Sequence, residues 1–208
     1  MKLQAALDTL TLDECIKLLE QTQGSIDVVE VGTPFVIEQG MVPVRTFKEK
    51  FPNIEVLADA KIMDAGKYEA DKCFDAGADI VTVLGVSNDA TIKGVVESAK
   101  EHGRKVMVDM IEVKNLAERT KEVDQMGVDY ICVHTAFDVQ ATGKDPLDDL
   151  KVVNSVIKNA QSAVAGGVKL ATIDAIVEEG AGIIVVGGAI CNAEDPSAMA
   201  KEMKKHLK

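Results

Sequence analysis

The amino-acid sequence predicts an α/β protein that folds as a single (β/α)8 barrel, a TIM barrel, spanning residues 1–208. Three observations support this fold class. Short β-branched runs alternate with segments of helical periodicity, a pattern typical of a parallel sheet whose strands are connected by helices. A related segment recurs four times along the chain. The length of 208 residues is also enough for a compact barrel of eight strand–helix units.

Eight runs rich in Val, Ile and Leu are the candidate strands. They cover residues 3–8, 27–31, 54–59, 79–84, 105–110, 129–134, 162–165 and 182–186. Between them, residues 89–103 and 116–127 place apolar side chains at helical spacing, begin near Asp or Asn, and stop at Gly. We therefore expect strands and helices to alternate along the whole chain.

The recurring segment begins each time at a glycine shortly before a strand. Its copies are Gly24-Ser25-Ile26-Asp27, Gly77-Ala78-Asp79, Gly127-Val128-Asp129 and Gly180-Ala181-Gly182, and their leading glycines lie 53, 50 and 53 residues apart. Two strand–helix units per period and four periods predict a closed barrel. An open doubly wound sheet is the competing architecture, but no G-x-G-x-x-G motif follows the first strand.

The composition disfavours several partners and compartments. A net charge of −11 argues against nucleic acid and anionic membranes, which are bound through basic surfaces. The first residues include Lys2, Gln4 and Asp8 and do not resemble a secretory signal, and no apolar run approaches the ~18 residues that span a bilayer. We therefore expect a cytoplasmic protein. The four cysteines include no C-x-x-C pair, so neither a zinc knuckle nor a disulfide framework is predicted.

Polar residues stand where the predicted strands end, which in a (β/α)8 barrel is where the active site forms. They are Asp8, Glu30, Asp59, Lys61, Asp109 and His134. Strands seven and eight end instead in the pairs Gly166-Gly167 and Gly187-Gly188. Residues without side chains let backbone N–H groups cradle a phosphate, and barrels usually bind phosphate after these two strands. Tight left-handed turns are the alternative explanation of each pair.

Asp59 and Lys61 are two positions apart, so strand periodicity predicts that both project into the mouth of the barrel. Asp64 lies beyond the strand end and is free to reach elsewhere. A cation among carboxylates in a poorly solvated mouth carries a desolvation cost, which favours a functional role over a structural ion-pair network.

Glu30 and Asp59 offer two hard oxygen ligands on adjacent strands, and Mg²⁺ is commonly held by one or two carboxylates with substrate oxygens and water. Mn²⁺ shares these ligands. His134 closes an apolar strand and titrates in a range that suits proton transfer near neutral pH. A core histidine bonded to backbone is the alternative. Together these residues suit chemistry on a small phosphorylated carbonyl compound.

The same residues resemble the orotidine 5′-monophosphate decarboxylase suprafamily and, within it, the 3-hexulose-6-phosphate synthase branch. The most specific motif is the D-x-K-x-x-D formed by Asp59, Lys61 and Asp64. The other matching segments, which extend over the whole chain, are Ala6-Leu7-Asp8, Val29-Glu30-Val31-Gly32-Thr33, Val108-Asp109-Met110, Cys132-Val133-His134-Thr135, Ala165-Gly166-Gly167 and Val186-Gly187-Gly188.

This resemblance implies an aldolase-type carbon–carbon lyase. The expected reaction is the reversible aldol addition of formaldehyde to D-ribulose 5-phosphate, which gives D-arabino-hex-3-ulose 6-phosphate through a metal-stabilised enediolate. By the same resemblance, Glu30 and Asp59 would ligand Mg²⁺ and His134 would take a proton from C1 of the sugar phosphate. Lys61 would hold the enediolate, and Asp8 would contact the sugar hydroxyls. A homodimer with shared active sites is also implied, in which Asp64 serves the partner's site.

Other positions separate this branch from the 3-keto-L-gulonate-6-phosphate decarboxylases, the nearest relatives and the alternative function. Asp109, Phe137 and Ala165 follow the synthase pattern, whereas the decarboxylases typically carry Glu, Arg and Thr there. One feature departs from the decarboxylases' phosphate loop, because Gly187-Gly188-Ala189 has no Arg and would bind phosphate mainly through backbone N–H groups. A non-catalytic sugar-phosphate-binding barrel is the alternative of another class, and the set of buried ionisable groups argues against it.

Overall fold

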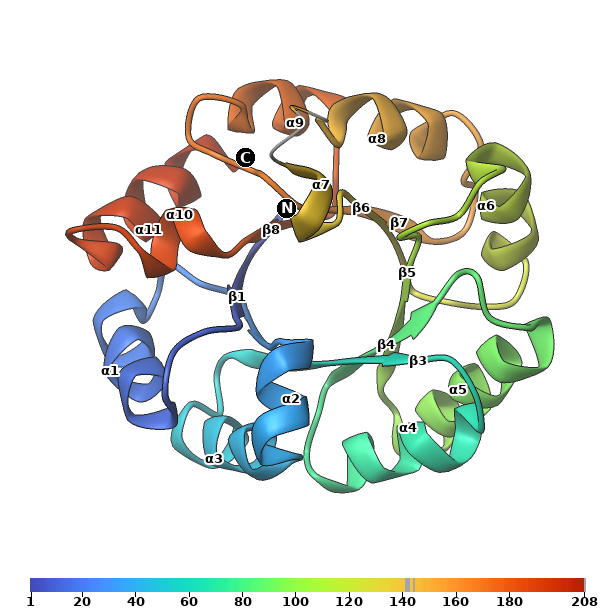
Figure 1. Cartoon of the computed structure of the whole chain (residues 1–208), viewed down its shortest axis with the longest axis horizontal. Helices are drawn as coiled ribbons and strands as arrows, with labels where there is room; N and C mark the ends of the chain where they lie inside the picture. The colour runs from blue at the N-terminus through green and yellow to red at the C-terminus, as the bar shows by residue number, and fades with distance from the viewer. Residues whose placement is uncertain (141–142, 144, 208) are drawn as a thin grey trace.

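The computed structural model describes residues 1–140, 143 and 145–207 and shows a closed barrel of eight parallel strands, which confirms the predicted fold class (Figure 1). The strands follow one another around the barrel in chain order, and β1 pairs with both β2 and β8. Their bounds are β1 (Lys2–Leu7), β2 (Val28–Val31), β3 (Glu55–Ile62), β4 (Ile80–Leu84), β5 (Lys105–Asp109), β6 (Tyr130–His134), β7 (Gln161–Ala165) and β8 (Ile183–Val186).

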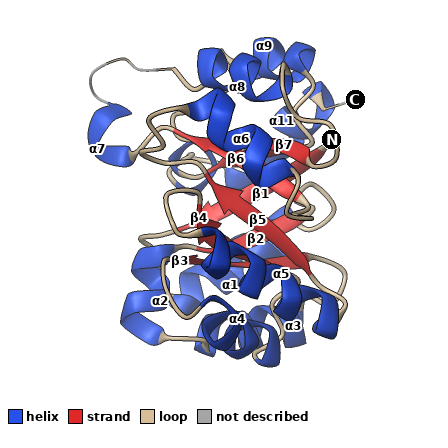
Figure 2. Cartoon of the chain, turned by 90° about the vertical axis from the view of Figure 1, so that its right-hand side faces the viewer, coloured by secondary structure: helices blue, strands red, loops and turns tan. Residues whose placement is uncertain are grey.

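Helices form a ring around the strands, and in the side view they cover the tilted strands at the middle of the molecule (Figure 2). They are α1 (Leu12–Thr22), α2 (Thr33–Gln39), α3 (Val42–Lys50), α4 (Gly66–Asp75), α5 (Asp89–His102), α6 (Leu116–Asp124), α7 (Phe137–Gln140), α8 (Leu147–Asn154), α9 (Ile173–Glu179), α10 (Gly188–Cys191) and α11 (Pro196–His206). None of the described helices is long and apolar enough to cross a membrane.

The helix predicted over residues 89–103 is α5, which ends at a left-handed Gly103. The helix predicted over residues 116–127 is α6, which ends earlier, at Asp124. The Asp124 carboxylate accepts hydrogen bonds from the backbone N–H groups of Lys158, Asn159 and Ala160. This side chain therefore anchors the segment that leads into β7.

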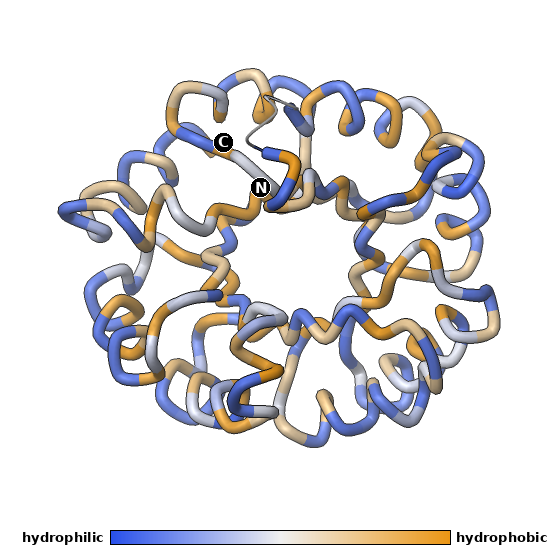
Figure 3. Tube along the Cα trace, in the orientation of Figure 1, coloured by the Kyte–Doolittle hydropathy of each residue, from blue (hydrophilic) through white to orange (hydrophobic). Residues whose placement is uncertain are grey.

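Apolar side chains fill two separate regions of the molecule. The larger core lies between the strands and the helices, where hydrophilic and hydrophobic stretches alternate along each helix (Figure 3). The second core lies inside the barrel and consists of Ala6, Val28, Leu57, Ile80, Met107, Tyr130, Cys132, Ala163, Ala165, Ile183 and Val185. These inward residues come from alternating positions on every strand, as the layered filling of such barrels requires.

The fourfold sequence repeat has a physical basis in a hydrogen bond from an Asp side chain to the backbone. In three copies an Asp precedes an even-numbered strand, and its carboxylate accepts the N–H of the second residue of the preceding odd-numbered strand. The bonds are Leu3 N to Asp27 Oδ2 at 2.7 Å, Val56 N to Asp79 Oδ2 at 2.9 Å and Val106 N to Asp129 Oδ2 at 2.8 Å. The fourth copy has Gly182 at this place, whose own N–H donates to the carbonyl of Ser162 at 2.8 Å.

Strand β3 departs from regular geometry at its carboxyl end. We expected it to end at Asp59, but it continues to Ile62, with a shift in its register against β4 between Ala58 and Ile62. Within this bulge Lys61 has a φ of +45°, a left-handed conformation that costs a non-glycine residue about 1–2 kcal/mol. Asp59 and Lys61 do face the same cavity as predicted, but through this bulge rather than through strict strand alternation.

Asp79 makes the most connected bond of the repeat and provides a test of it. Its carboxylate also accepts from Lys48 Nζ at 2.7 Å and from the guanidinium of Arg104. Asp79→Ala would leave two cations and a buried N–H without this partner, so we expect the free energy of unfolding to fall by about 2–4 kcal/mol in urea denaturation. Asp148→Ala, whose side chain is 93% exposed, should change it by under about 0.5 kcal/mol. Equal effects of the two substitutions would contradict a structural role for the repeat.

Candidate active site

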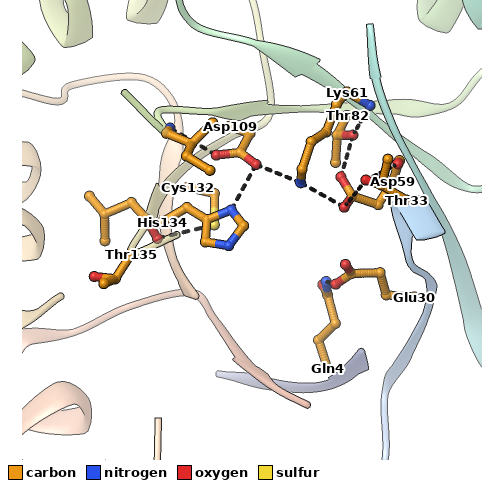
Figure 4. A network of polar contacts seen from close by, with 12 residues as sticks. Gln4, Glu30, Thr33, Asp59, Lys61, Thr82, Asp109, Cys132, His134 and Thr135 are labelled. Atoms are coloured by element: carbon orange, nitrogen blue, oxygen red, sulfur yellow. Dashed lines mark hydrogen bonds and ion pairs between the residues drawn. The ribbon is translucent and has the colours of Figure 1, made fainter. Parts of the chain in front are cut away.

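The carboxyl ends of the strands enclose a small cavity inside the barrel, and five of the predicted site residues line it. Glu30, Asp59, Lys61, Asp109 and His134 reach it from β2, β3, β5 and β6. Figure 4 shows these side chains together with their polar partners. The remaining lining residues are Gln4, Leu57, Thr82, Met107, Cys132, Ala165 and Val185. The fold thus brings together five predicted residues that are far apart in the chain.

The ammonium group of Lys61 lies between two buried carboxylates. Its Nζ donates to Asp59 Oδ2 at 2.7 Å and to Asp109 Oδ2 at 3.0 Å. Burial would lower the pKa of Lys61, but the charges and hydrogen bonds of Asp59 and Asp109 outweigh it and raise the pKa above its usual range. The side chain is therefore a fixed cation at neutral pH, placed beside the cavity.

His134 joins the network through Asp109. Its Nδ1 lies 2.9 Å from Asp109 Oδ2, the same oxygen that Lys61 contacts. Burial would raise the pKa of Asp109, but the hydrogen bond and charge of His134, with Lys61 and the N–H of Ile111, lower it to about 2. An ionised carboxylate only accepts hydrogen bonds, so Nδ1 carries the proton and Nε2 of a neutral His134 is left able to take one. This is the arrangement of an oriented general base.

Two hydroxyl groups fix the orientation of Asp59. Thr33 Oγ1 lies 2.8 Å from Asp59 Oδ2 and from the Asp59 carbonyl, while Thr82 Oγ1 donates to Asp59 Oδ1 at 2.7 Å. We did not predict Thr33, Thr82 or Gln4 as site residues. A signal for Thr82 and Gln4 was present, because each is a polar residue at an inward position with apolar neighbours on both sides along its strand.

Glu30 is buried close to two other carboxyl groups. Gln4 Nε2 donates to Glu30 Oε2 at 2.5 Å. Burial, and then the negative charges of Asp59 and Asp8, raise the pKa of Glu30 well above its usual range, although the Gln4 bond and Lys61 act in the opposite direction. A crowded set of carboxylates with a neutral amide donor is electrostatically suited to a cation.

The donor set fits a hard divalent metal with an open coordination sphere. Within residues 1–140, 143 and 145–207, no group of three or more His, Cys, Asp and Glu side chains is arranged to hold a metal ion. Glu30 and Asp59 alone supply two carboxylates, which leaves the other positions to substrate and water, as Mg²⁺ sites commonly do. The residues present therefore fit Mg²⁺ or Mn²⁺ and do not form an all-protein metal cage.

Asp8 lies at the rim, just beyond β1. The residue is exposed, but its carboxyl packs so closely on Gly32 that a Cβ there would lie 1.9 Å from Asp8 Oδ1. This partial burial and the charge of Asp59 raise the pKa of Asp8, while Lys61 and His134 oppose the change. Asp8 therefore shares the electrostatic field of the cavity and stands at its entrance.

The two glycine pairs lie at the same end of the barrel but differ in geometry. Gly166 and Gly167 have φ values of +90° and +76°, and a Cβ on Gly166 would lie 2.2 Å from the Thr135 carbonyl oxygen. Glycine is thus required there by the turn itself, as the alternative explanation held. Gly187 and Gly188 have no positive φ; they begin the short α10, and Gly187 lies against Ala6 and Asp8.

Asp64 is the predicted site residue that lies outside this cavity. It is exposed and lines a separate groove on the loops after β3, β4 and β5, with residues such as Val86, Asn88 and Glu112. Arg119 holds one wall of the groove through hydrogen bonds to the carbonyls of Gly85 and Ser87, at 2.8 and 2.9 Å. Asp64 is therefore placed away from the polar network of its own barrel.

The barrel and the oriented histidine–carboxylate–lysine network at its mouth define an enzyme of the (β/α)8 class. The family model for "Orotidine 5'-phosphate decarboxylase / HUMPS family" matches residues 1–203. The chain belongs to this family.

Relatives with assigned names are similar along their whole length. A 3-hexulose-6-phosphate synthase of Bacillus subtilis is 50% identical over 205 residues, covering 99% of this chain and 98% of the relative. One of Staphylococcus epidermidis is 52% identical over 204 residues, covering 98% and 97%. The crystal structure of 3-hexulose-6-phosphate synthase from Salmonella typhimurium has a TM-score of 0.97 at 45% identity, covering 100% of this chain and 98% of that one.

The low pKa of Asp109 makes stability depend on pH in a defined direction. A carboxyl with a lowered pKa stabilises the folded state above its unfolded pKa, and this contribution is lost as pH falls through the folded value. The pKa falls from the ordinary 3.8 to about 2. From about pH 5 toward pH 2, the parent should therefore lose roughly 2 kcal/mol more than Asp109→Asn in urea unfolding. The exposed substitution Asp13→Asn should follow the parent, and parallel curves for Asp109→Asn would rule out the ion pair.

Proposed function

We propose that this enzyme catalyses the aldol addition of formaldehyde to D-ribulose 5-phosphate to give D-arabino-hex-3-ulose 6-phosphate, and the reverse cleavage. The observation that carries the proposal is the network in which Asp109 orients His134 and Lys61 beside a small cavity. The names of relatives at 50% and 52% identity support the same reaction.

His134 is the proposed base. With the Nδ1 proton held by Asp109, its Nε2 can remove the proton from C1 of ribulose 5-phosphate. The electron pair left at C1 is delocalised into the C2 carbonyl, which gives an enediolate. The C1=C2 electron pair of the enediolate then forms a bond to the formaldehyde carbon, and the C2 carbonyl re-forms. The C=O π bond of formaldehyde breaks, and its oxygen takes back the proton that His134 removed. No redox partner is needed, because the addition conserves electrons.

Lys61 is the proposed stabiliser of the negative charge that develops on the enediolate oxygens. Its ammonium is already partly buried and held between Asp59 and Asp109, so little reorganisation is needed when the charge appears. Mg²⁺ held by Glu30 and Asp59 would supply Lewis-acid stabilisation of the same oxygens. Lys61 would therefore share the stabilisation of this negative charge with a metal ion when one is bound.

The rim residues would orient the sugar phosphate. Asp8 stands at the entrance and can accept hydrogen bonds from sugar hydroxyls. The loops that begin at Gly166-Gly167 and Gly187-Gly188 come from neighbouring strands β7 and β8, which pair directly. Their location supports phosphate binding by backbone N–H groups, with the reacting end of the sugar extending toward His134.

A direct assay decides between this reaction and decarboxylation. The metal-depleted enzyme is incubated with ribulose 5-phosphate and formaldehyde, with and without Mg²⁺, beside a second assay of CO₂ release from 3-keto-L-gulonate 6-phosphate. We expect formaldehyde to disappear in step with hexulose phosphate formation, only when Mg²⁺ is present, and without CO₂ release in the second assay. Failure to consume formaldehyde overturns the synthase proposal, and full turnover in EDTA overturns the role of the metal.

We further propose a homodimer in which Asp64 completes the partner's active site. Asp64 lies in a groove outside its own network, where it is available to a second copy. Large exposed apolar residues stand at the same end, in segments that follow β2, β3 and β4. They are Ile37, Val42, Met63, Tyr68 and Val86, with exposures of 81, 51, 51, 67 and 45%. Exposed apolar side chains of this size favour an interface between copies.

Mixing two inactive variants tests both His134 and Asp64. We expect His134→Ala to lose most turnover but keep sugar-phosphate binding, and Asp64→Asn to lose most turnover as well. In a mixed dimer one site would regain both residues, so an equal mixture after subunit exchange should recover about a quarter of parent activity. The control is each variant exchanged with itself. A mixture as inactive as its components would show that Asp64 does not act across the interface.

A further inference from the structure

We propose that Thr82 is a positioning residue that locks the Asp59–Lys61 pair into its working geometry. The proposal deepens the function proposed above and rests on it for the reaction, although its structural part can be tested separately. Thr82 lies at the middle of β4, at an inward position, and is only 3% exposed. Its hydroxyl contacts the Asp59 side chain and the main chain of Lys61 (Figure 4).

The Thr82 hydroxyl makes a hydrogen bond in each direction. It accepts the backbone N–H of Lys61 at 2.9 Å and donates its own hydrogen to Asp59 Oδ1 at 2.7 Å. A hydroxyl has one hydrogen to donate, so its donor capacity is used entirely by Asp59. One atom therefore ties the main chain of Lys61 to the carboxylate that its ammonium contacts.

The bulge in β3 explains why this connection is needed. In a regular parallel pair the N–H of a strand residue would bond to a carbonyl of the neighbouring strand. The register shift between Ala58 and Ile62 interrupts that ladder, and Lys61 adopts a left-handed φ of +45°. The Thr82 side chain takes the place of the missing carbonyl, and so supports a backbone conformation that lysine would otherwise leave.

Thr33 does not duplicate this role. Its hydroxyl lies 2.8 Å from Asp59 Oδ2 and from the Asp59 carbonyl, so it restrains Asp59 from the β2 side. Thr82 instead contacts the opposite oxygen of Asp59 and reaches the Lys61 main chain. Loss of Thr82 would therefore release the strained lysine backbone as well as one carboxylate oxygen, whereas the Thr33 hydroxyl contacts Asp59 and not the Lys61 main chain.

The test uses three substitutions at Thr82 and one matched control. Thr82→Val keeps the shape but removes the hydroxyl, Thr82→Ser keeps the hydroxyl, and Thr82→Cys retains a weaker donor of similar size. Thr120→Val makes the same chemical change at a fully buried threonine on α6, far from the cavity in the fold. The measurements are kcat and KM for ribulose 5-phosphate, and hydrogen exchange of the Lys61 amide in metal-free protein.

We expect Thr82→Val to lower kcat roughly 10- to 100-fold, because the Lys61 N–H loses its acceptor and the ammonium loses its alignment. KM should change by less than about threefold, since the Thr82 hydroxyl donates its one hydrogen to Asp59 and has none left for the substrate. The Lys61 amide should exchange at least about tenfold faster. Thr82→Ser should restore most of both properties, Thr82→Cys should lie between, and Thr120→Val should match the parent.

Either of two results would overturn the proposal: Thr82→Val that keeps parent kcat and Lys61 protection, or Thr82→Ser that loses as much as Thr82→Val. If Thr82→Val does not fold, the ordering of the parent, the Ser variant and the Cys variant decides in the same way. If the parent itself consumes no formaldehyde, the proposed function fails, while the exchange of the Lys61 amide still tests the connection made by Thr82.

Discussion

The site depends on one partly buried ammonium group held between two buried carboxylates. Asp59 and Asp109 are withdrawn from water and Lys61 is partly so, and the desolvation of these charges is offset only while the three remain in contact. Strands β3 and β5 hold these three side chains in contact. The bulge in β3 places the lysine, and Asp109 uses the same oxygen to orient His134.

The interior of the barrel strengthens this arrangement because polar and apolar residues are unevenly distributed along it. Leu57, Met107 and Val185 line the same cavity as the charged groups, so part of the cavity wall is apolar. In such surroundings the effective dielectric constant is low, so a fixed charge acts more strongly on a substrate than it would in water. The second apolar core is therefore part of the electrostatics of the site as well as of its stability.

Periodicity in the sequence was sufficient to predict the barrel and the convergence of five polar strand-end residues on one cavity. All eight predicted strands overlap an observed one, because buried parallel strands are apolar and their polar terminal residues are conspicuous. The left-handed backbone of Lys61 could not be predicted in this way, since alternation describes regular strands and a bulge breaks it. Thr82 stands out as the polar residue of an apolar strand, but its contacts with Asp59 and the Lys61 main chain depend on the bulge opposite, which no local pattern reveals.

The seam between β1 and β8 has a consequence for how the chain reaches this structure. Lys2 pairs with Ile183 and Gln4 with Val185, so β8 covers the second edge of β1. Because β1 is synthesised long before β8, that edge stays open in the meantime. Contacts so distant in sequence close slowly, and an open edge can meanwhile pair with another chain. We therefore expect the formation of β8 to end the period in which β1 can pair with another chain. The four residues of β8, Ile183–Val186, are all apolar and buried, which favours its packing once it is made.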